Sequence, residues 1–232
     1  MALFFMQVAK HILLVGAPET GMSRGLGRCY DVAAVIVNPP GYAMSQTRLF
    51  IVHGYTASPD AHWFPWLKAE LEARDVRVEV LAMPDPHHPK PATWDAAMDS
   101  LVQDHDEHTF LLGHSLGCIT ILRQLDRLPA GSQVGGILLV SGFDQPLHTL
   151  PELDPFMTPD YDPARIMALA PRRVVIASRD DAIVPYPYCQ HLSERLSAPL
   201  YSLEHGGHFL DRDGFLTLPL VRDRLLAMLA EG

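Results

Sequence analysis

One serine of this sequence lies where its neighbours would make it a nucleophile. Ser115 is the middle residue of GHSLG at 113–117, a G-x-S-x-G pattern. The apolar stretch 109–112 predicts a buried strand before it, and apolar residues at helical spacing predict a helix after it. A sharp turn from strand to helix crowds the backbone around the serine, and the two glycines relieve that crowding. The N–H groups that begin the helix would face an oxyanion formed there.

A serine hydroxyl is a weak nucleophile until a base removes its proton, and two histidines are candidates for that base. His205 and His208 both follow a predicted strand at 200–203. Gly206 and Gly207 would free the backbone to bring His208 toward the sheet edge, whereas His205 closes the strand. His208 is therefore the predicted general base. The pair does not predict a zinc site, because the sequence places no third ligand near it.

Two adjacent aspartates, Asp180 and Asp181, are candidates to orient the imidazole and stabilise its charged form. Both follow a predicted strand at 173–177. Asp181 is favoured because Asp181-x-x-Val184-Pro185 is similar to the pattern around the acid of α/β-hydrolases, and Asp180 would be a turn or capping residue. The chain order of serine, aspartate and histidine is also that of the α/β-hydrolase triad.

These candidates must be positioned by the ends of neighbouring strands. Alternating apolar strands and helical segments predict an α/β protein with the α/β-hydrolase fold, a mostly parallel sheet of about six strands with helices on both faces. Loops that follow parallel strands gather at the carboxyl edge of the sheet, where ligands bind. The proline-rich stretch 145–170 predicts a small cap segment at this edge. The predicted strands are 49–52, 76–81, 109–112, 134–140, 173–177 and 200–203.

Two backbone N–H groups are predicted to form an oxyanion hole. The strand 49–52 is followed by the loop HGYT at 53–56. In α/β-hydrolases the loop after this strand contributes one N–H group, and the residue after the nucleophile contributes the other. The amides of Tyr55 and Leu116 are therefore the predicted pair. His53 is expected to brace the loop through a hydrogen bond rather than to act in catalysis.

An unusually aromatic run, HWFPW at 62–66, comes shortly after this loop. Most of the run is expected in the core, and one ring, Trp63 or Trp66, is predicted to line the substrate pocket. His87 and His88 have the side chains of metal ligands, but adjacent residues on extended backbone point in opposite directions. A solvated loop is the favoured interpretation for these two histidines.

The composition of the chain argues against several classes of function. Its 232 residues are 48% hydrophobic and 19% charged, which fits one globular α/β domain. A formal net charge of −9 argues against nucleic-acid or anionic-membrane partners. The partner expected from the candidate triad is a small-molecule, ester-like substrate. Three widely spaced cysteines predict neither a disulfide framework nor a zinc site, and favour a cytoplasmic setting. No cofactor and no metal are expected.

Residues 1–43 differ from the rest of the chain. The segment 16–23 is one residue from a P-loop, but Met22 stands where the phosphate-binding lysine should be. A glycine-rich turn is therefore favoured over a nucleotide site. Met44 directly precedes the predicted hydrolase domain, 44–232. Two interpretations stay open: residues 1–43 result from an upstream mis-start before Met44, or they form a genuine N-terminal extension.

Six short motifs occur in one order along the chain: HGYTAS at 53–58, HWFPW at 62–66, Met83-Pro84 with Pro86, GHSLGC at 113–118, Ser178-x-x-Asp181 with Val184-Pro185, and HGGHF at 205–209. Together they resemble the YdeN family, the bacterial branch of the retinoblastoma-binding protein 9 group of serine hydrolases. The resemblance runs from about Arg48 to the C-terminus. It implies a compact α/β-hydrolase in which Ser115, Asp181 and His208 are the catalytic triad.

The sequence thus predicts a cytoplasmic serine hydrolase that acts on small esters, amides or thioesters through an acyl-enzyme. The main alternative is a non-catalytic protein-binding module on the same scaffold, in which the triad is idle. A third interpretation, a nucleotide-binding protein using 16–23, is disfavoured by Met22.

Overall fold

A computed structural model describes residues 46–230 of the chain. The segment 1–43, its P-loop-like turn at 16–23 and the position of Met44 lie outside the described residues. The two interpretations of that segment, and the domain boundary proposed after residue 43, therefore stay predictions.

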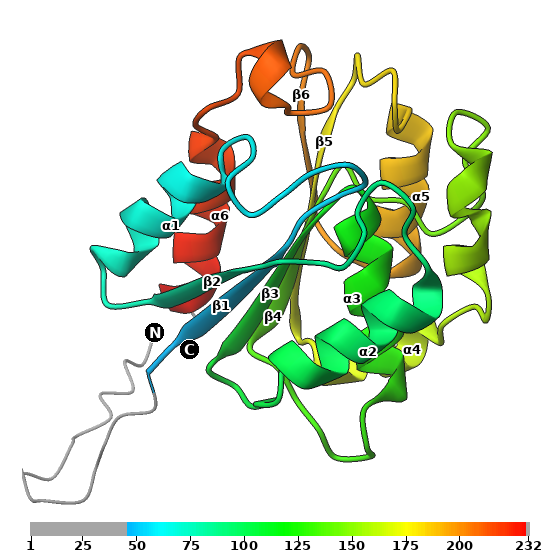
Figure 1. Ribbon diagram of the computed structural model, residues 1–232. Coiled ribbons are helices and arrows are strands. Elements are labelled where there is room, and N and C mark those ends of the chain that lie inside the picture. Colours follow the sequence, from blue (N-terminus) through cyan, green and yellow to red (C-terminus); the bar gives the residue numbers. More distant parts are fainter. Residues whose placement is uncertain (1–45, 231–232) are drawn as a thin grey trace, which may run out of the picture. The chain divides into compact units, whose positions relative to one another are not determined.

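The described residues form one six-stranded sheet in which every neighbouring pair of strands is parallel (Figure 1). The strand order is β2-β1-β3-β4-β5-β6. This arrangement agrees with the prediction of a mostly parallel sheet of about six strands. The strands are β1 (Arg48–Val52), β2 (Arg77–Leu81), β3 (Thr109–His114), β4 (Gly136–Val140), β5 (Arg172–Ser178) and β6 (Leu200–Leu203).

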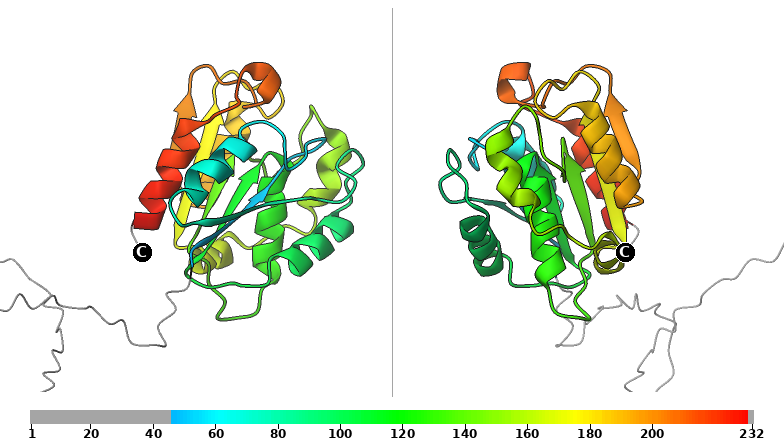
Figure 2. Two further views of the ribbon diagram at one scale, coloured as in Figure 1. Left: turned by 60° about the vertical axis from the view of Figure 1, so that its left-hand side comes forward. Right: turned by 90° about the vertical axis from the view of Figure 1, so that its right-hand side faces the viewer.

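Helices cover both faces of the sheet (Figure 2). One face packs against α1 (Phe64–Glu72) and α6 (Pro219–Ala230), and the other against α2 (Pro91–Leu101), α3 (Leu116–Arg127) and α5 (Tyr186–Arg195). Central strands buried on both faces need apolar residues at every position rather than at alternate ones. The strand β4, with the sequence GILLV, is accordingly buried throughout.

The proline-rich segment between β4 and β5 is short and is attached to the helices beside it. It contains a 3-10 helix, η1 (Pro151–Met157), and the helix α4 (Pro163–Leu169). Leu153 and Phe156 of η1 lie in the core cluster on the α3 face of the sheet. The Arg123 guanidinium of α3 donates hydrogen bonds to the Phe156 and Thr158 carbonyls and so attaches the segment to α3.

Among the helices of residues 46–230, none combines the length and the apolar character that crossing a lipid bilayer requires.

Candidate active site

The turn from β3 into α3 holds Ser115 in a conformation that non-glycine residues rarely adopt. Its φ and ψ angles are 54° and −119°, and it immediately precedes the first residue of α3. The backbone there is packed against β1, because a Cβ atom added to Gly117 would collide with the carbonyl oxygen of Val52. Glycine is needed at 117 so that the serine can stand at the carboxyl end of the sheet.

His208 and Asp181 are hydrogen-bonded to each other in the loops that follow β5 and β6. The Nδ1 atom of His208 lies 2.7 Å from Oδ2 of Asp181, and both side chains are buried. The other carboxylate oxygen, Oδ1, accepts the backbone N–H groups of Ile183 and Val184, each at 2.9 Å. The loop after β5 therefore fixes the carboxylate, and the carboxylate fixes the imidazole.

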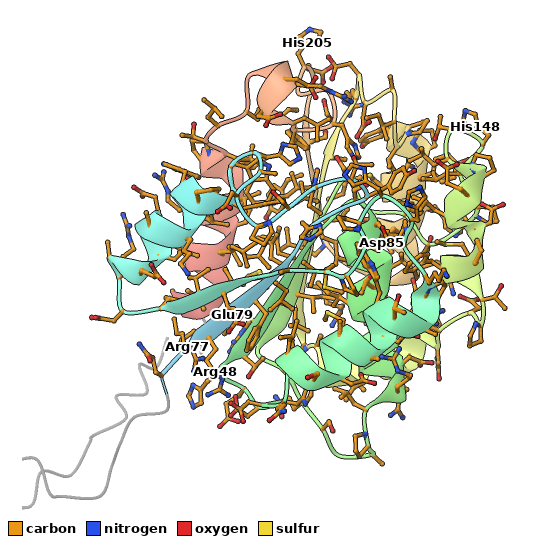
Figure 3. The ribbon with its side chains drawn as sticks, viewed as in Figure 1. Arg48, Arg77, Glu79, Asp85, His148 and His205 are labelled. Carbon is orange, nitrogen blue, oxygen red and sulfur yellow. The ribbon has the colours of Figure 1, made fainter. Side chains whose placement is uncertain are left out.

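The neighbouring carboxylate of Asp180 binds different groups. Its Oδ1 accepts the Ser178 hydroxyl at 2.6 Å and the N–H groups of Gly206 and Gly207 at 2.9 Å. These bonds connect the loop after β5 to the loop after β6, and Gly207 has a positive φ of 51°. His205 contacts Asp180 but projects from the surface, with 90% of its side chain exposed (Figure 3). Of the two aspartates and two histidines, the structure pairs Asp181 with His208 in a buried hydrogen bond, whereas Asp180 and His205 meet at the surface.

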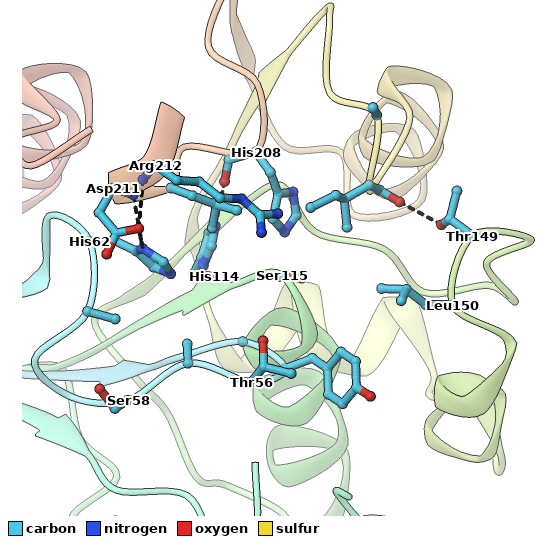
Figure 4. A pocket seen from close by; sticks show the side chains of 17 residues that line it. Thr56, Ser58, His62, His114, Ser115, Thr149, Leu150, His208, Asp211 and Arg212 are labelled. Atoms are coloured by element: carbon cyan, nitrogen blue, oxygen red, sulfur yellow. Dashed lines mark hydrogen bonds and ion pairs between the residues drawn. The ribbon is translucent and has the colours of Figure 1, made fainter. Parts of the chain in front are cut away.

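Ser115 and His208 line the same cavity, whose volume is about 710 Å³ (Figure 4). Within the described part of the chain, the Ser115 hydroxyl forms no hydrogen bond to His208. Hydrogen bonds between catalytic groups are often long in the absence of substrate and tighten when substrate binds. With Nδ1 of His208 bonded to Asp181, the Nε2 atom is the one left to exchange a proton with substrate or serine.

Leu116 directly follows Ser115, and Tyr55 of the loop after β1 lines the same cavity as Ser115. Leu116 is the first residue of α3, where an N–H group has no partner within the helix. A Cβ atom on Gly54 would lie only 2.9 Å from Cβ of Ser115, so the loop after β1 passes close to the serine. Within residues 46–230, neither amide donates to a protein group. Both N–H groups are therefore available to an oxyanion.

His53 braces this loop, as expected from the sequence. Its Nε2 accepts the backbone N–H of Met83 at 3.2 Å, and its Nδ1 lies 2.9 Å from the Gly54 carbonyl. Burial lowers the pKa of the ring, so it stays neutral and holds both bonds. His53 therefore connects the loop after β1 to the loop after β2.

The two tryptophans proposed for the substrate pocket lie elsewhere. Trp63 is fully buried in the core cluster under α1, and its Nε1 donates to the Phe209 carbonyl at 3.1 Å. Trp66 packs on the outside of the same cluster, with the Arg222 guanidinium 5.6 Å from its ring. The prediction that one of these rings lines the pocket is wrong, because Trp63 packs in the core and Trp66 packs against α6, and neither is among the residues that line the cavity. From the run 62–66, His62 is the residue that reaches the cavity.

Several residues that line the cavity were not predicted from the sequence. His62 reaches it from the loop before α1, Asp211 and Arg212 from the loop after β6, and Thr149 and Leu150 from the proline-rich segment. His62 belongs to the aromatic run, and Thr149 and Leu150 belong to the stretch 145–170 that was predicted to form a cap at this edge. Asp211 and Arg212 stood in no motif, and long-range packing brings them to the cavity.

His114, the residue before Ser115, also lines this cavity. Its Nε2 lies 3.0 Å from the backbone carbonyl of His208, and the two rings are 4.9 Å apart. Burial lowers the pKa of His114 well below its ordinary value, so the ring is a neutral donor to that carbonyl. The variable position of the G-x-S-x-G motif thus helps to hold the loop that carries His208.

Among residues 46–230, no group of three or more His, Cys, Asp or Glu side chains is arranged to hold a metal ion. His88 lies 3.4 Å from Asp85 on an exposed loop, and both side chains are mostly solvent-accessible.

Comparison with known proteins finds relatives that match most of the chain. The Bacillus subtilis (strain 168) protein YdeN is 45% identical over 178 residues, which are 77% of this chain and 94% of YdeN. Serine hydrolase RBBP9 of Rattus norvegicus is 28% identical over 186 residues, or 78% of this chain and 97% of that protein. The crystal structure of the ydeN gene product from B. subtilis matches with a TM-score of 0.78 at 43% identity, covering 79% of this chain and 99% of that one.

The family relationship follows from these comparisons together with the fold. The described residues have the α/β-hydrolase architecture, and the ydeN gene product has the same fold. The model of the family described as "Serine hydrolase" matches residues 49–227. This chain belongs to the serine hydrolase family.

Proposed function

We propose that this protein cleaves small esters, and by the same chemistry amides or thioesters, through an acyl-enzyme formed on Ser115. The observation that carries the proposal is the buried 2.7 Å hydrogen bond between His208 Nδ1 and Asp181 Oδ2, with His208 lining the same cavity as Ser115. A buried carboxylate that orients an imidazole beside a serine is the arrangement that activates a hydroxyl nucleophile.

In the proposed reaction, Nε2 of His208 takes the proton of the Ser115 hydroxyl as its oxygen attacks the substrate carbonyl carbon. Asp181 stabilises the imidazolium that results. The negative charge that develops on the carbonyl oxygen is bound by the N–H groups of Tyr55 and Leu116, each typically worth about 3–4 kcal/mol. His208 then protonates the departing alcohol, and a water molecule activated by the same histidine releases the acid from Ser115.

The proposed setting of this reaction is the cytoplasm, with a small molecule as substrate. Cys118 and Cys189 are free and buried, and burial raises the pKa of both thiols, which keeps them unreactive. The formal charge of −9 is unfavourable for binding nucleic acid or anionic lipid. The proposed chemistry needs no cofactor, because the chain supplies the nucleophile, the base and the oxyanion donors.

The proposal is tested by turnover of p-nitrophenyl acetate and butyrate. We expect Ser115→Ala and His208→Ala to lose at least about 10³-fold in kcat, since each removes a reacting group. His205→Ala is the matched control in the same loop and should keep wild-type turnover, because its side chain is exposed. Wild-type turnover by Ser115→Ala would contradict the proposal. A folded wild type without turnover would favour the protein-binding module.

A further inference from the structure

The cavity has two chemically different sides, with Ser115 between them (Figure 4). One side is apolar: Leu150 and Ile183 line it, and the Thr149 hydroxyl is occupied by a 2.6 Å hydrogen bond to the Ile183 carbonyl. The other side carries His62, Asp211 and Arg212. An ester has an acyl half and an alcohol half on either side of its carbonyl carbon. The two halves of a substrate attacked by Ser115 would therefore meet different surfaces.

On the polar side, the Asp211 carboxylate is engaged by its own loop. Its Oδ1 accepts the backbone N–H of Arg212 at 2.7 Å and lies 3.4 Å from Nδ1 of His62. The backbone N–H of Asp211 donates to that same Nδ1 at 3.1 Å. Burial lowers the pKa of His62, so the ring is neutral, accepts at Nδ1 and carries its proton on Nε2. His62 therefore presents a hydrogen-bond donor, Nε2–H, with no protein acceptor in the described part of the chain.

The Arg212 guanidinium is a cation without a partner. It forms no ion pair or hydrogen bond with any side chain or carbonyl of residues 46–230, and in Figure 4 it reaches from its loop into the cavity. It is also the one Lys or Arg among the residues that line this cavity in the described structure. Other arginines behave differently: Arg123, Arg195 and Arg222 each bind a carboxylate within 3.2 Å. In a chain of net charge −9, an unpaired cation beside the nucleophile favours an anionic ligand.

We propose that Arg212, together with the Nε2–H group of His62, binds a carboxylate on the substrate of Ser115. The substrate class is then an ester with one apolar half, held against Leu150 and Ile183, and one half that carries a carboxylate. A guanidinium binds a carboxylate through two parallel N–H···O bonds, which gives direction as well as attraction. This inference rests on the proposed function, since it names the substrate class of the same site.

The test compares charged and neutral esters of equal size in two pairs. In the first pair the charge is on the acyl half: mono-4-nitrophenyl adipate against 4-nitrophenyl adipamate. In the second it is on the alcohol half: 3-(butanoyloxy)benzoate against 3-(butanoyloxy)benzamide. Each is measured with the wild type, Arg212→Gln and Arg179→Gln, and Ser115→Ala supplies the blank for spontaneous hydrolysis. Arg179 is the matched control, an exposed arginine paired with Glu204 outside the cavity.

We expect the wild type to prefer the charged member of one pair by about fivefold to tenfold in kcat/KM, a moderate value because Arg212 is exposed. The pair that shows the preference identifies the half that carries the carboxylate. Arg212→Gln should bring the ratio close to one, and Arg179→Gln should leave it at the wild-type value. High salt should lower the ratio by screening the charge.

The inference would be overturned if the wild type hydrolysed the neutral ester of each pair, the adipamate and the benzamide, as fast as its charged counterpart or faster. The proposed function would then remain intact. A preference that survives in Arg212→Gln would likewise overturn the inference. A wild type that hydrolyses none of the four esters contradicts the proposed function, and the inference falls with it. A substitution that only impairs folding or general activity lowers kcat/KM for both members of a pair and leaves their ratio unchanged.

Discussion

At the scale of single residues, Asp180 and Asp181 are adjacent in the chain but bind different groups. Asp181 accepts two backbone N–H groups with one oxygen and holds His208 with the other. Asp180 instead joins Gly206 and Gly207 to the end of β5. The first carboxylate holds the proposed general base, whereas the second closes a loop, so the same substitution at the two positions should have different effects.

We expect Asp181→Asn to lower kcat for p-nitrophenyl butyrate by about 10²- to 10⁴-fold, because an amide neither stabilises the imidazolium nor selects the right tautomer of His208. Asp180→Asn is the matched control one residue away and should keep kcat within about threefold of wild type. Steady-state kinetics of the two variants measures this difference. Equal loss of kcat in both variants would contradict the assignment of Asp181.

The Asp180 variant should show its effect in stability, with a defined pH dependence. Hydrogen bonds from the Gly206 amide, and then from Ser178 and Gly207, hold the pKa of this carboxyl well below its usual range. A group with a lowered folded-state pKa stabilises the fold above its unfolded value, about 3.9, and this contribution disappears as pH falls through the folded value. Asp180→Asn should therefore melt at a lower temperature than wild type at pH 7, and the gap should narrow below about pH 4. A difference in melting temperature that does not change with pH would contradict this role of the Asp180 carboxylate.

At the scale of elements, a buried polar cluster attaches the proline-rich segment to α5. The Tyr161 hydroxyl donates to Asp144 Oδ2 at 2.6 Å, and Arg195 of α5 donates to the same oxygen at 2.9 Å. Burial, together with the Asp144 charge, raises the pKa of Tyr161 far above its ordinary value, so its hydroxyl stays a donor. The Asp144 side chain is fully buried, which makes the loss of either donor costly.

We expect Tyr161→Phe to lower the free energy of unfolding by about 2 kcal/mol, because it removes one hydrogen bond from a buried carboxylate. Tyr188→Phe is the matched control: it removes a hydroxyl whose partner, His148, lies 3.3 Å away in an exposed pair. That change should cost less than about 0.5 kcal/mol. Urea unfolding of both variants measures the difference, and equal stability of the two would show that the cluster does not hold the segment.

At the scale of the whole molecule, the features that could be predicted from the sequence, namely the strands and the loops that follow them, are those that depend on residues close together in the chain. The central strands were recognisable because a buried parallel strand is a continuous apolar run, whereas β2 was recognisable by its alternation of apolar and polar residues. Ser115, Asp181 and His208 could be proposed as a triad because each lies in the segment that follows a predicted strand. The carboxyl edge of a parallel sheet then brings these loops together without further information.

What the sequence did not predict depends on long-range packing. The contact between His62 and Asp211 joins residues 149 positions apart. Trp63 was misplaced because the direction of its ring depends on where α1 packs, and that requires α6 and the sheet. Arg212 stood in no motif, and its lack of a partner can be recognised only when the surrounding carboxylates have been placed.

The central claim is that Ser115 is an activated nucleophile, and reaction with a fluorophosphonate probe followed by peptide mapping tests it most directly. We expect one equivalent of label on the wild type, attached to the peptide that contains Ser115. Ser115→Ala should take up no label, and His208→Ala should react far more slowly because its serine lacks a base. Failure of the folded wild type to react, or label on a different residue, would contradict the account.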